Sequence, residues 1–551
     1  MRFEGTNDQD GPGTWQECAR PGLTAGFNPA TMPIQLKRTA TGAFILQEVD
    51  WPKRGVGDDG TNGEPSFVGN EINKVLFWRN RICFLSSTNV IASQPGDDNI
   101  LFPDFWVKTA LTISPQDVID LSASSDNPAF LYDGLETVQG LLLFSENQQF
   151  LLTAEAEVLN PETAKLTSQS TYNYNISNPA VSLGTTVGFL DNAGSQSRFF
   201  EMSNIQRGLE PEIIEISAPV PDFLPKNIDL ITNSRENTFI FFAVSNTSDV
   251  YGYRYFNSSE KRLQSAWFKW KLRKDIQYHC AIDDTYYAVL SDSNLVKFDL
   301  RDEDSTAALD VTVDSNNPKA GNFKIHLDSY TSVKKSTMTY HPSSNTTTFP
   351  LPSNNSIYDQ NTNIKVLDDN KNWIEKPDPD DSSTWIYHNN FGRYGEATVS
   401  GGLATLQGDW RTPLVDSDGN DISIYIGYNF DMEVKFPTIY ITSGTGENRK
   451  SDINASLIIH RLKLALGGSG VYETLIQRKG KPDYTELFES SQQDLYLSNT
   501  AAWLDRKVHT IPTYERNTNL TVYLKSTHPS PTTLLSMSWE GDYSNRYYQR
   551  A

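Results

Sequence analysis

The 551-residue sequence contains only three cysteines, Cys18, Cys83 and Cys280, which stand far apart. A disulfide framework or a zinc site needs clustered cysteines, so we predict neither and expect three buried small hydrophobic residues. No stretch approaches the ~18 consecutive apolar residues of a membrane-spanning helix, which predicts no stable membrane insertion. The N-terminus is acidic and polar and lacks the apolar segment of a secretory signal, which predicts synthesis in a cytosol.

Sequence motifs of catalysis are also missing. The seven histidines stand singly, and the sequence has no phosphate-binding loop, nucleophile elbow or H-E-x-x-H pattern. Adjacent carboxylates such as Asp283-Asp284 occur in turn-like sequence and point apart, whereas a glycosidase needs two that face each other. The run Asp416–Asp421 lacks two ligands of a calcium loop. We therefore predict no catalytic, metal-binding or cofactor-binding residues and no enzymatic activity.

Positive charge is scarce, with 47 basic against 68 acidic residues and a net charge of −21. A protein that grips nucleic acid usually carries a basic stripe. The acidic balance indicates either simple solubility or a surface that DNA passes without binding. The most basic run, Ala266–Arg273, alternates Trp and Lys and could face nucleic acid. We favour a strand with its apolar side chains inward and its lysines outward.

Short apolar runs between turn residues dominate the rest of the sequence. A 3.6-residue apolar period is absent, and the even spacing of the runs predicts an all-β barrel, sandwich or propeller. The clearest set is Lys74–Arg79, Arg81–Ser86 and Asn89–Ser93, an antiparallel meander so rich in apolar residues that both faces must be covered. Groups of three or four strands recur about every 45 residues from Thr31 to Arg301, which favours a propeller.

Other patterns predict local structure. Ile34–Ala40 and Phe44–Asp50 should pair as a hairpin, and Pro219–Asn227 could hold one helical turn. Four further expectations are strands at Gln264–Leu272 and Tyr278–Asp283, a single strand at Ala397–Leu406, and a long two-stranded ribbon at Asn454–Lys479 around Gly467–Gly470.

Several motifs follow one another in a fixed order along the chain. Phe77, Arg79 and Arg81 form an F-x-R-x-R pattern, followed by Phe84 in F-L-S and by N-V-I-A-S. The motifs outside this region are Thr31-Met-Pro33, Trp51-Pro52, Pro65–Gly69, Ile424–Tyr428 and the W-E-G-D-Y run from Trp539 to Tyr543. Together they resemble the tail nozzle proteins, or tail tubular proteins B, of short-tailed podoviruses.

This resemblance implies a fold and a set of structural motif residues. The fold would be a distorted β-propeller followed by a second β domain with a loop-rich insertion. Trp15–Gly22 resembles the end of the family's N-terminal platform, so the chain resembles the C-terminal two-thirds of the family sequence. The predicted domains are 1–30 (platform remnant), 31–301 (β-propeller), 302–383 (loop-rich insertion or boundary) and 384–551 (second β domain). The predicted structural motif residues are Phe77, Arg79, Arg81, Phe84, Trp539 and Tyr543.

The resemblance also implies a function. The protein would be a non-enzymatic part of the virion tail, made in the host bacterial cytoplasm, and six copies would form a ring at the distal end of the DNA channel. The ring would contact the adaptor ring and the tail fibres, retain the genome and open for ejection. The residues of the channel gate are not identified, but loops within Asp302–Ser383 are candidates. An alternative stays open: a stand-alone propeller that binds or cleaves a host-surface glycan.

Overall fold

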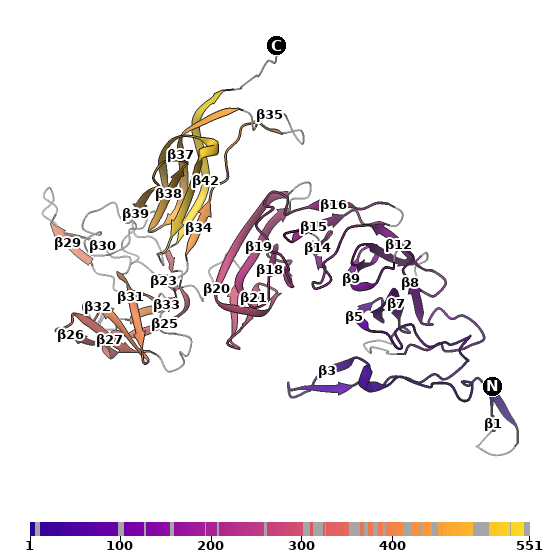
Figure 1. Ribbon diagram of the computed structural model, residues 1–551. Coiled ribbons are helices and arrows are strands. Elements are labelled where there is room, and N and C mark those ends of the chain that lie inside the picture. The colour runs from indigo at the N-terminus through magenta and orange to yellow at the C-terminus, as the bar shows by residue number, and fades with distance from the viewer. Residues whose placement is uncertain are drawn as a thin grey trace, which may run out of the picture. The chain divides into compact units, whose positions relative to one another are not determined.

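The computed structural model of the chain consists of β-strands and three short 3-10 turns, with no α-helix among the residues that it describes (Figure 1). It follows that no described segment is a helix able to cross a membrane. The structure describes all residues except 6–10, 97–103, 126–127, 155–158, 193, 207–208, 258–261, 301–308, 312–322, 326, 352–363, 369–372, 378–383, 389–392, 412–413, 415–420, 422, 429–430, 444–449, 453–454, 489–505, 529–530 and 545–551. The prediction of an all-β fold is confirmed. The chain divides into two compact units, Met1–Glu303 and Asp304–Ala551.

The first unit contains two short hairpins and four antiparallel sheets, in which the strands follow one another in chain order. The hairpins are β1 (Arg2–Gly5) with β2 (Gly13–Gln16), and β3 (Ile34–Arg38) with β4 (Phe44–Glu48), the second preceded by a 3-10 turn at Pro29–Thr31. The first two sheets are β5 (Ile72–Trp78), β6 (Arg81–Ser86), β7 (Asn89–Ala92) and β8 (Ile119–Ser122), then β9 (Leu131–Thr137), β10 (Gly140–Ser145), β11 (Gln149–Ala154) and β12 (Ala164–Ser170). The third is β13 (Val181–Ser182), β14 (Val187–Asp191), β15 (Arg198–Ser203) and β16 (Glu212–Glu215). The fourth is β17 (Leu230–Ser234), β18 (Phe239–Ala243), β19 (Thr247–Asn257), β20 (Arg262–Ile282), β21 (Thr285–Leu290) and β22 (Leu295–Asp299).

Successive sheets of the first unit share hydrophobic cores. Cys83 and Leu85 of β6 face a core shared with the β9–β12 sheet, whereas Phe84 between them faces a second core on the opposite side. The meander is therefore covered on both faces, as its apolar load predicts. Phe199 and Phe242 join the third and fourth sheets in the same way, with ring centroids 5.1 Å apart. Stacked four-stranded meanders are the building units of propellers, and closure into a propeller stays a prediction.

The second unit contains one large sheet and a β-sandwich. The large sheet has the strand order β25-β33-β28-β31-β32-β27-β26. Its strands are β25 (Asp328–Lys334), β26 (Thr339–His341), β27 (Thr346–Pro350), β28 (Ile364–Asp368), β31 (Arg393–Ser400), β32 (Leu403–Gln407) and β33 (Ser423–Tyr428), with a 3-10 turn at Lys335–Thr337. Smaller pairs are β23 (Leu309–Val311) with β24 (Phe323–Ile325), β29 (Trp373–Pro377) with β30 (Thr384–His388), and β35 (Thr442–Ser443) with β36 (Lys450–Ser451). The large sheet thus combines strands from both sides of residue 384, and the domain boundaries given above stay a prediction.

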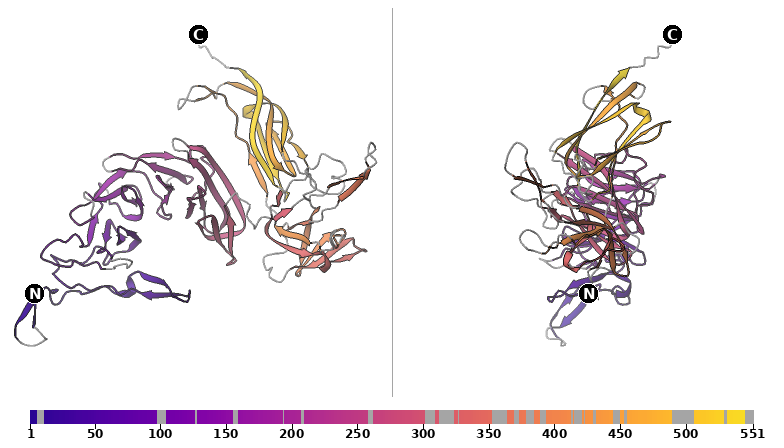
Figure 2. Two further views of the ribbon diagram at one scale, coloured as in Figure 1. Left: turned by 180° about the vertical axis from the view of Figure 1, so that it is seen from behind. Right: turned by 90° about the vertical axis from the view of Figure 1, so that its left-hand side faces the viewer.

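The sandwich packs a three-stranded sheet, β40-β37-β42, against a four-stranded sheet, β34-β41-β38-β39 (Figure 2). Its strands are β34 (Met432–Lys435), β37 (Ser456–Ser469), β38 (Tyr472–Arg478), β39 (Tyr484–Phe488), β40 (Lys507–Arg516), β41 (Leu520–Ser526) and β42 (Thr532–Ser544), with a 3-10 turn at Asn517–Asn519. The predicted ribbon over Asn454–Lys479 is wrong, because β37 and β38 belong to different sheets. Leu464 of β37 and Ile476 of β38 both face the core between the sheets.

Three other local predictions change in the structure. Pro219–Asn227 forms consecutive turns and no helix. The strands predicted at Gln264–Leu272 and Tyr278–Asp283 are parts of one strand, β20, which continues through a bulge at Ile276 to Tyr278. The single strand predicted at Ala397–Leu406 is a hairpin of β31 and β32, in which Gly401 and Gly402 turn the chain with φ of +58° and +79°.

The hairpin predicted at Ile34–Ala40 and Phe44–Asp50 forms, whereas the prediction of three buried cysteines holds for one of them. The β3–β4 hairpin forms with Ile34 opposite Glu48 and Arg38 opposite Phe44. All three cysteines are free, but only Cys83 is buried, whereas Cys18 and Cys280 are half-buried. Burial raises the pKa of the Cys83 thiol to about 12, so this residue acts as an inert apolar side chain.

Candidate functional site

The F-x-R-x-R residues lie on the β5–β6 hairpin. Phe77 is near the end of β5 and is 56% exposed. Arg79 and Asn80 form the turn with φ of +47° and +62°, the left-handed conformation that two-residue hairpin turns require. The Arg79 guanidinium carbon lies 5.2 Å from the centre of the Trp78 ring. The side chain of Arg79 is exposed at the surface.

Arg81, by contrast, is 2% exposed and binds main-chain oxygens from two connections, β7–β8 and β11–β12. Its Nη1 donates to the carbonyls of Ser93 and Asp117, both at 2.7 Å. Its Nη2 donates to the carbonyls of Pro115 at 3.0 Å and Leu159 at 3.4 Å. Burial lowers the pKa of the guanidinium. Four carbonyls facing one cation tie these loops to the first sheet, so the role of Arg81 in this structure is to position backbone.

Phe84 occupies the centre of an aromatic cluster that joins motifs far apart in the sequence. Its ring centroid lies 6.0 Å from that of Trp51, 5.2 Å from Phe67 and 4.7 Å from Phe105. Met32 packs into the same core. The motifs around residues 31–33, 51–52 and 65–69 thus meet the meander in one place, which the sequence alone did not reveal.

The W-E-G-D-Y residues lie in the second unit, on β42. Trp539 is partly buried against the sandwich core, and the Tyr543 hydroxyl donates to the Asp452 carboxylate at 2.8 Å. A Cβ at Gly541 would lie 2.1 Å from the Ile458 carbonyl oxygen on β37, so only glycine fits between the paired strands here. The six predicted motif residues therefore fall into two groups in different units, and none of them forms a shared reaction centre.

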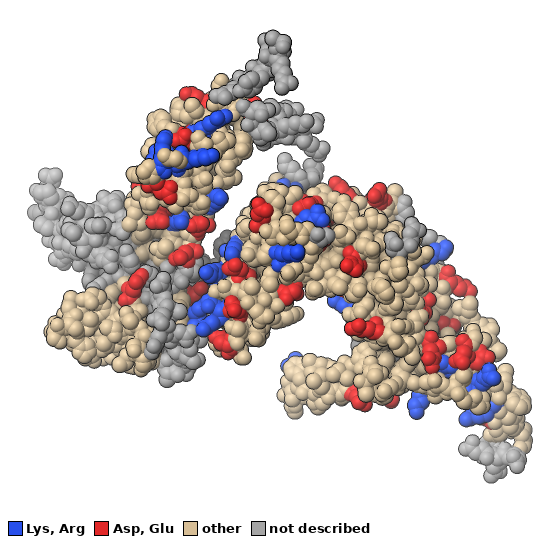
Figure 3. All heavy atoms as spheres, viewed as in Figure 1, with Lys and Arg blue, Asp and Glu red and all other residues tan. Residues whose placement is uncertain are grey.

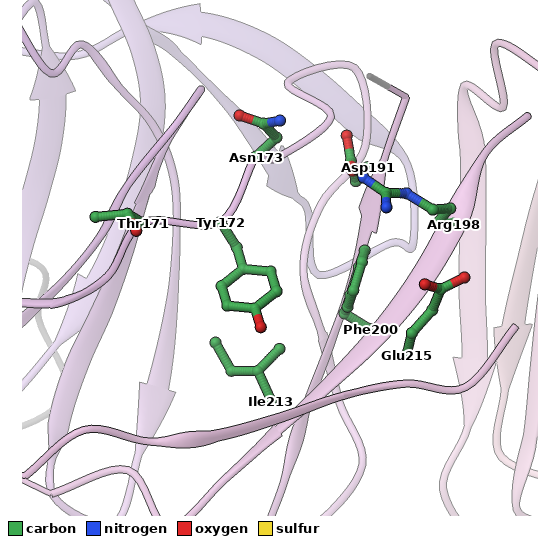
Figure 4. A pocket seen from close by; sticks show the side chains of 8 residues that line it. All are labelled: Thr171, Tyr172, Asn173, Asp191, Arg198, Phe200, Ile213 and Glu215. Atoms are coloured by element: carbon green, nitrogen blue, oxygen red, sulfur yellow. Dashed lines mark hydrogen bonds and ion pairs between the residues drawn. The ribbon is translucent and has the colours of Figure 1, made fainter. Parts of the chain in front are cut away.

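A surface pocket of about 410 Å³ lies at the third sheet, and the sequence reasoning missed it (Figure 4). It is lined by Thr171, Tyr172, Asn173, Asp191, Arg198, Phe200, Ile213 and Glu215. Asp191 and Arg198 are opposite each other on β14 and β15 and form an ion pair. The Arg198 guanidinium also lies 5.3 Å from the Phe200 ring centre.

The carboxylates of this pocket are held in other interactions. Asp191 is paired with Arg198, and Glu215 accepts a hydrogen bond from the Ser217 hydroxyl at 3.1 Å. A general acid and a general base need free carboxyl groups that face each other across a substrate. In the part of the chain that the structure describes, no three His, Cys, Asp or Glu side chains gather in a metal-binding arrangement. The pocket thus has polar side chains in its lining, but its two carboxyl groups are not arranged as a general acid and a general base.

The Trp- and Lys-rich run lies in β20 and packs mainly within the fourth sheet. Phe268 and Trp270 contact the core of that sheet, and Trp267 contacts the neighbouring one. Lys269 points outward and pairs with Asp249 at 2.7 Å. This arrangement agrees with the structural interpretation of the run, because its aromatic faces are used in packing.

The comparisons with known proteins identify the family. The sequence profile described as bacteriophage nozzle protein matches residues 2–550. Tail tubular protein gp12 of Escherichia phage T7 is 24% identical over 533 residues, which cover 94% of this chain and 61% of that protein. The chain therefore spans less than two thirds of the length of this curated relative.

Solved structures give only weak likenesses. Hsv2p of Kluyveromyces lactis has a TM-score of 0.28 and 9% identity over 64% of this chain and 89% of its own. BamB of Moraxella catarrhalis has a TM-score of 0.23 and 8% identity over 48% of this chain and 75% of its own. Scores this low do not establish a shared fold, whereas the profile match extends over nearly every residue. The chain belongs to the bacteriophage nozzle protein family.

Proposed function

We propose that six copies of this chain form a closed ring at the distal end of the DNA channel of a phage tail. The observation that carries the proposal is the family match over residues 2–550, which makes the chain a structural component of a tail nozzle. A cyclic ring needs a head-to-tail interface, so each copy must present two different contact surfaces. In the virion this ring would contact the adaptor ring above it and the tail fibres beside it, and the chain would be made in the host bacterial cytoplasm.

The ring acts as a passive conduit and has no enzymatic role. The family is one of structural tail proteins. The pocket carboxylates Asp191 and Glu215 are engaged with Arg198 and Ser217, which argues against the alternative of a glycan-cleaving protein. Release of reducing ends from host polysaccharide by the purified chain would contradict this part of the proposal.

DNA passes through the ring without specific binding. The net charge of −21 opposes phosphate binding, and on the face shown in Figure 3 acidic side chains lie beside the basic ones in each unit. At physiological salt, repulsion between an acidic wall and DNA reaches only about 8–10 Å, which keeps the duplex away from the wall but does not hold pressurised DNA. Retention therefore needs a steric gate. We place the gate in loops of residues 302–383, much of which lies outside the described residues.

Two measurements test this proposal. Mass photometry of the purified chain should give a species of six times 61.9 kDa, and a symmetric map of the particle should show Asp and Glu on the channel wall. A monomer or trimer at all concentrations, or a wall of Lys and Arg, would overturn it. Duplex DNA should show no measurable binding near physiological salt, and tight, salt-sensitive binding would contradict passive passage.

We also propose that residues 302–383 separate two folded parts of the chain. Limited proteolysis should cut first in the parts of residues 302–383 outside the large sheet and leave two resistant fragments, because β25 to β27 and the flanking strands lie in sheets with buried cores. Early cleavage within β5 to β7 would contradict the division, since Cys83 to Leu85 and Val90 to Ala92 are at most 1% exposed.

A further inference from the structure

The β3–β4 hairpin differs from the other antiparallel pairs of the first unit, because every residue of its two strands is exposed. Among the described residues, contact with the core is made at its base: Met32 and Trp51 flank it and are buried in the aromatic cluster around Phe84. Figure 1 and Figure 2 show the two strands as a free arm with open edges. An isolated two-stranded hairpin is marginally stable in water, so such an arm needs a partner surface.

The register divides the arm into an apolar face and a polar face. Directly opposite residues share a face, so Leu36 with Leu46, Ile34 with Glu48 and Arg38 with Phe44 lie together. Ile34, Leu36, Phe44 and Leu46 are 58–66% exposed. Gln35, Lys37, Ile45 and Gln47 form the other face. Four neighbouring large apolar side chains left open to solvent mark an interaction surface.

We propose that the apolar face of the β3–β4 hairpin docks onto a second copy of this chain. Charge favours this occupant: Lys37 and Arg38 stand beside the turn at the tip of the arm, in a chain whose net charge is −21. A basic tip is attracted to the acidic surface of another copy. The inference rests on the proposed ring, in which the arm supplies one of the two different surfaces of the head-to-tail contact. The acceptor is therefore a surface other than the hairpin, since pairing of two arms about a two-fold axis would close a dimer.

Site-specific crosslinking of the purified full chain tests the contact directly. With the photoreactive residue p-benzoylphenylalanine in place of Phe44, irradiation should produce a product of twice the chain mass, with the crosslink mapped to one surface of the second copy. The same residue in place of Gln47, on the polar face, is the matched control and should crosslink much less. Crosslinks confined within one chain, scattered over many sites, or formed only when another tail protein is added would overturn the inference.

Self-association of matched variants separates this inference from the ring itself. Leu36→Ser/Leu46→Ser should weaken association at least tenfold, whereas Gln35→Ser/Gln47→Ser should stay within about twofold of the unchanged chain. At a concentration where each protein is monomeric, circular dichroism and Tm should be the same for all three, because the altered side chains are exposed. If the unchanged chain forms rings and the leucine variant forms them equally well, the hairpin inference fails and the ring stands. If the assembly is not a ring but Phe44 still crosslinks to a second copy, the ring fails and the hairpin contact stands.

Discussion

The β5–β8 sheet and the β3–β4 hairpin are both rich in apolar residues, yet they differ in what covers them. In the sheet, Phe84 is fully buried on one side and Leu85 on the other. In the hairpin, Phe44 is 64% exposed and Leu46 is 66% exposed. Large apolar side chains therefore form a core in one case and an open surface in the other. The difference lies in the neighbours, because the sheet is packed between other elements and the hairpin projects from its anchored base.

Buried apolar residues such as Phe84 stabilise the monomer, whereas exposed ones such as Phe44 are available to another chain. Burial of a large apolar side chain contributes about 1.5–3 kcal/mol to folding, whereas an exposed one contributes little until a partner covers it. The two arginines of the F-x-R-x-R pattern show the same contrast, with Arg81 buried and Arg79 exposed two residues earlier. Substitutions in matched pairs can therefore test the contrast.

The largest expected effect is at Phe84. Phe84→Ala should lower the free energy of unfolding of the first unit by about 3–5 kcal/mol, because it leaves a cavity among Trp51, Phe67 and Phe105. Phe44→Ala is the matched control and should change it by less than about 0.5 kcal/mol. Urea unfolding with hydrogen exchange of the β6 amides measures both. Equal losses for the two variants would refute the contrast between sheet and hairpin.

The second-largest loss of unfolding free energy is expected at Arg81. Arg81→Met keeps much of the side-chain volume but leaves the carbonyls of Ser93 and Asp117 without their donor, at a cost of about 3 kcal/mol. Arg79→Met should cost less than about 1 kcal/mol, since its side chain is exposed and its cation–π contact with Trp78 lies at the surface. The same unfolding experiment applies. A stability loss at Arg79 as large as that at Arg81 would show that burial does not distinguish their roles.

A smaller, pH-dependent effect is expected from His279, a buried polar residue of the fourth sheet whose Nδ1 lies 2.9 Å from the Tyr286 hydroxyl. Desolvation lowers its pKa to about 4, below the value of about 6.5 in the unfolded chain. Between these two pKa values the unfolded state therefore binds more protons than the folded state. The contribution of His279 to stability is complete above pH 6.5 and is lost as the pH falls toward 4. The loss at pH 5 should be about 2 kcal/mol.

His279→Gln should flatten this part of the stability profile, measured as Tm between pH 7 and pH 4.5. His341→Gln, at an exposed position on β26, is the control and should leave the profile unchanged. If His279→Gln leaves the acid-induced loss intact, the loss comes from other groups.

The smallest effect on monomer stability is expected in the hairpin itself. Leu36→Ser/Leu46→Ser should change the free energy of unfolding by less than about 0.5 kcal/mol per site, because both side chains are already exposed to water. Thermal unfolding at a concentration where the chain is monomeric measures this. A loss comparable with that of Phe84→Ala would mean that the hairpin packs against its own chain.

Much of the local structure could be predicted from the sequence, because each signal is short-range. Apolar runs broken by Asn, Asp and Gly predicted the all-β class, and the meander and the β3–β4 hairpin follow from alternation and turn residues. The ribbon at Asn454–Lys479 failed because a period of two is the same for two paired strands and for two strands that face each other across a core. The alternating residues of β37 and β38 fit both arrangements equally well.

The tertiary structure alone decided which apolar residues are covered and what each motif residue contacts. One partner of Arg81, the Leu159 carbonyl, lies 78 positions away in the sequence, and the cluster around Phe84 gathers side chains from four separate stretches. The sequence by itself determined the family and the strand-forming pattern. It did not determine that Phe84 is enclosed while Phe44 is open to solvent, because burial depends on long-range neighbours that alternation within a strand does not encode.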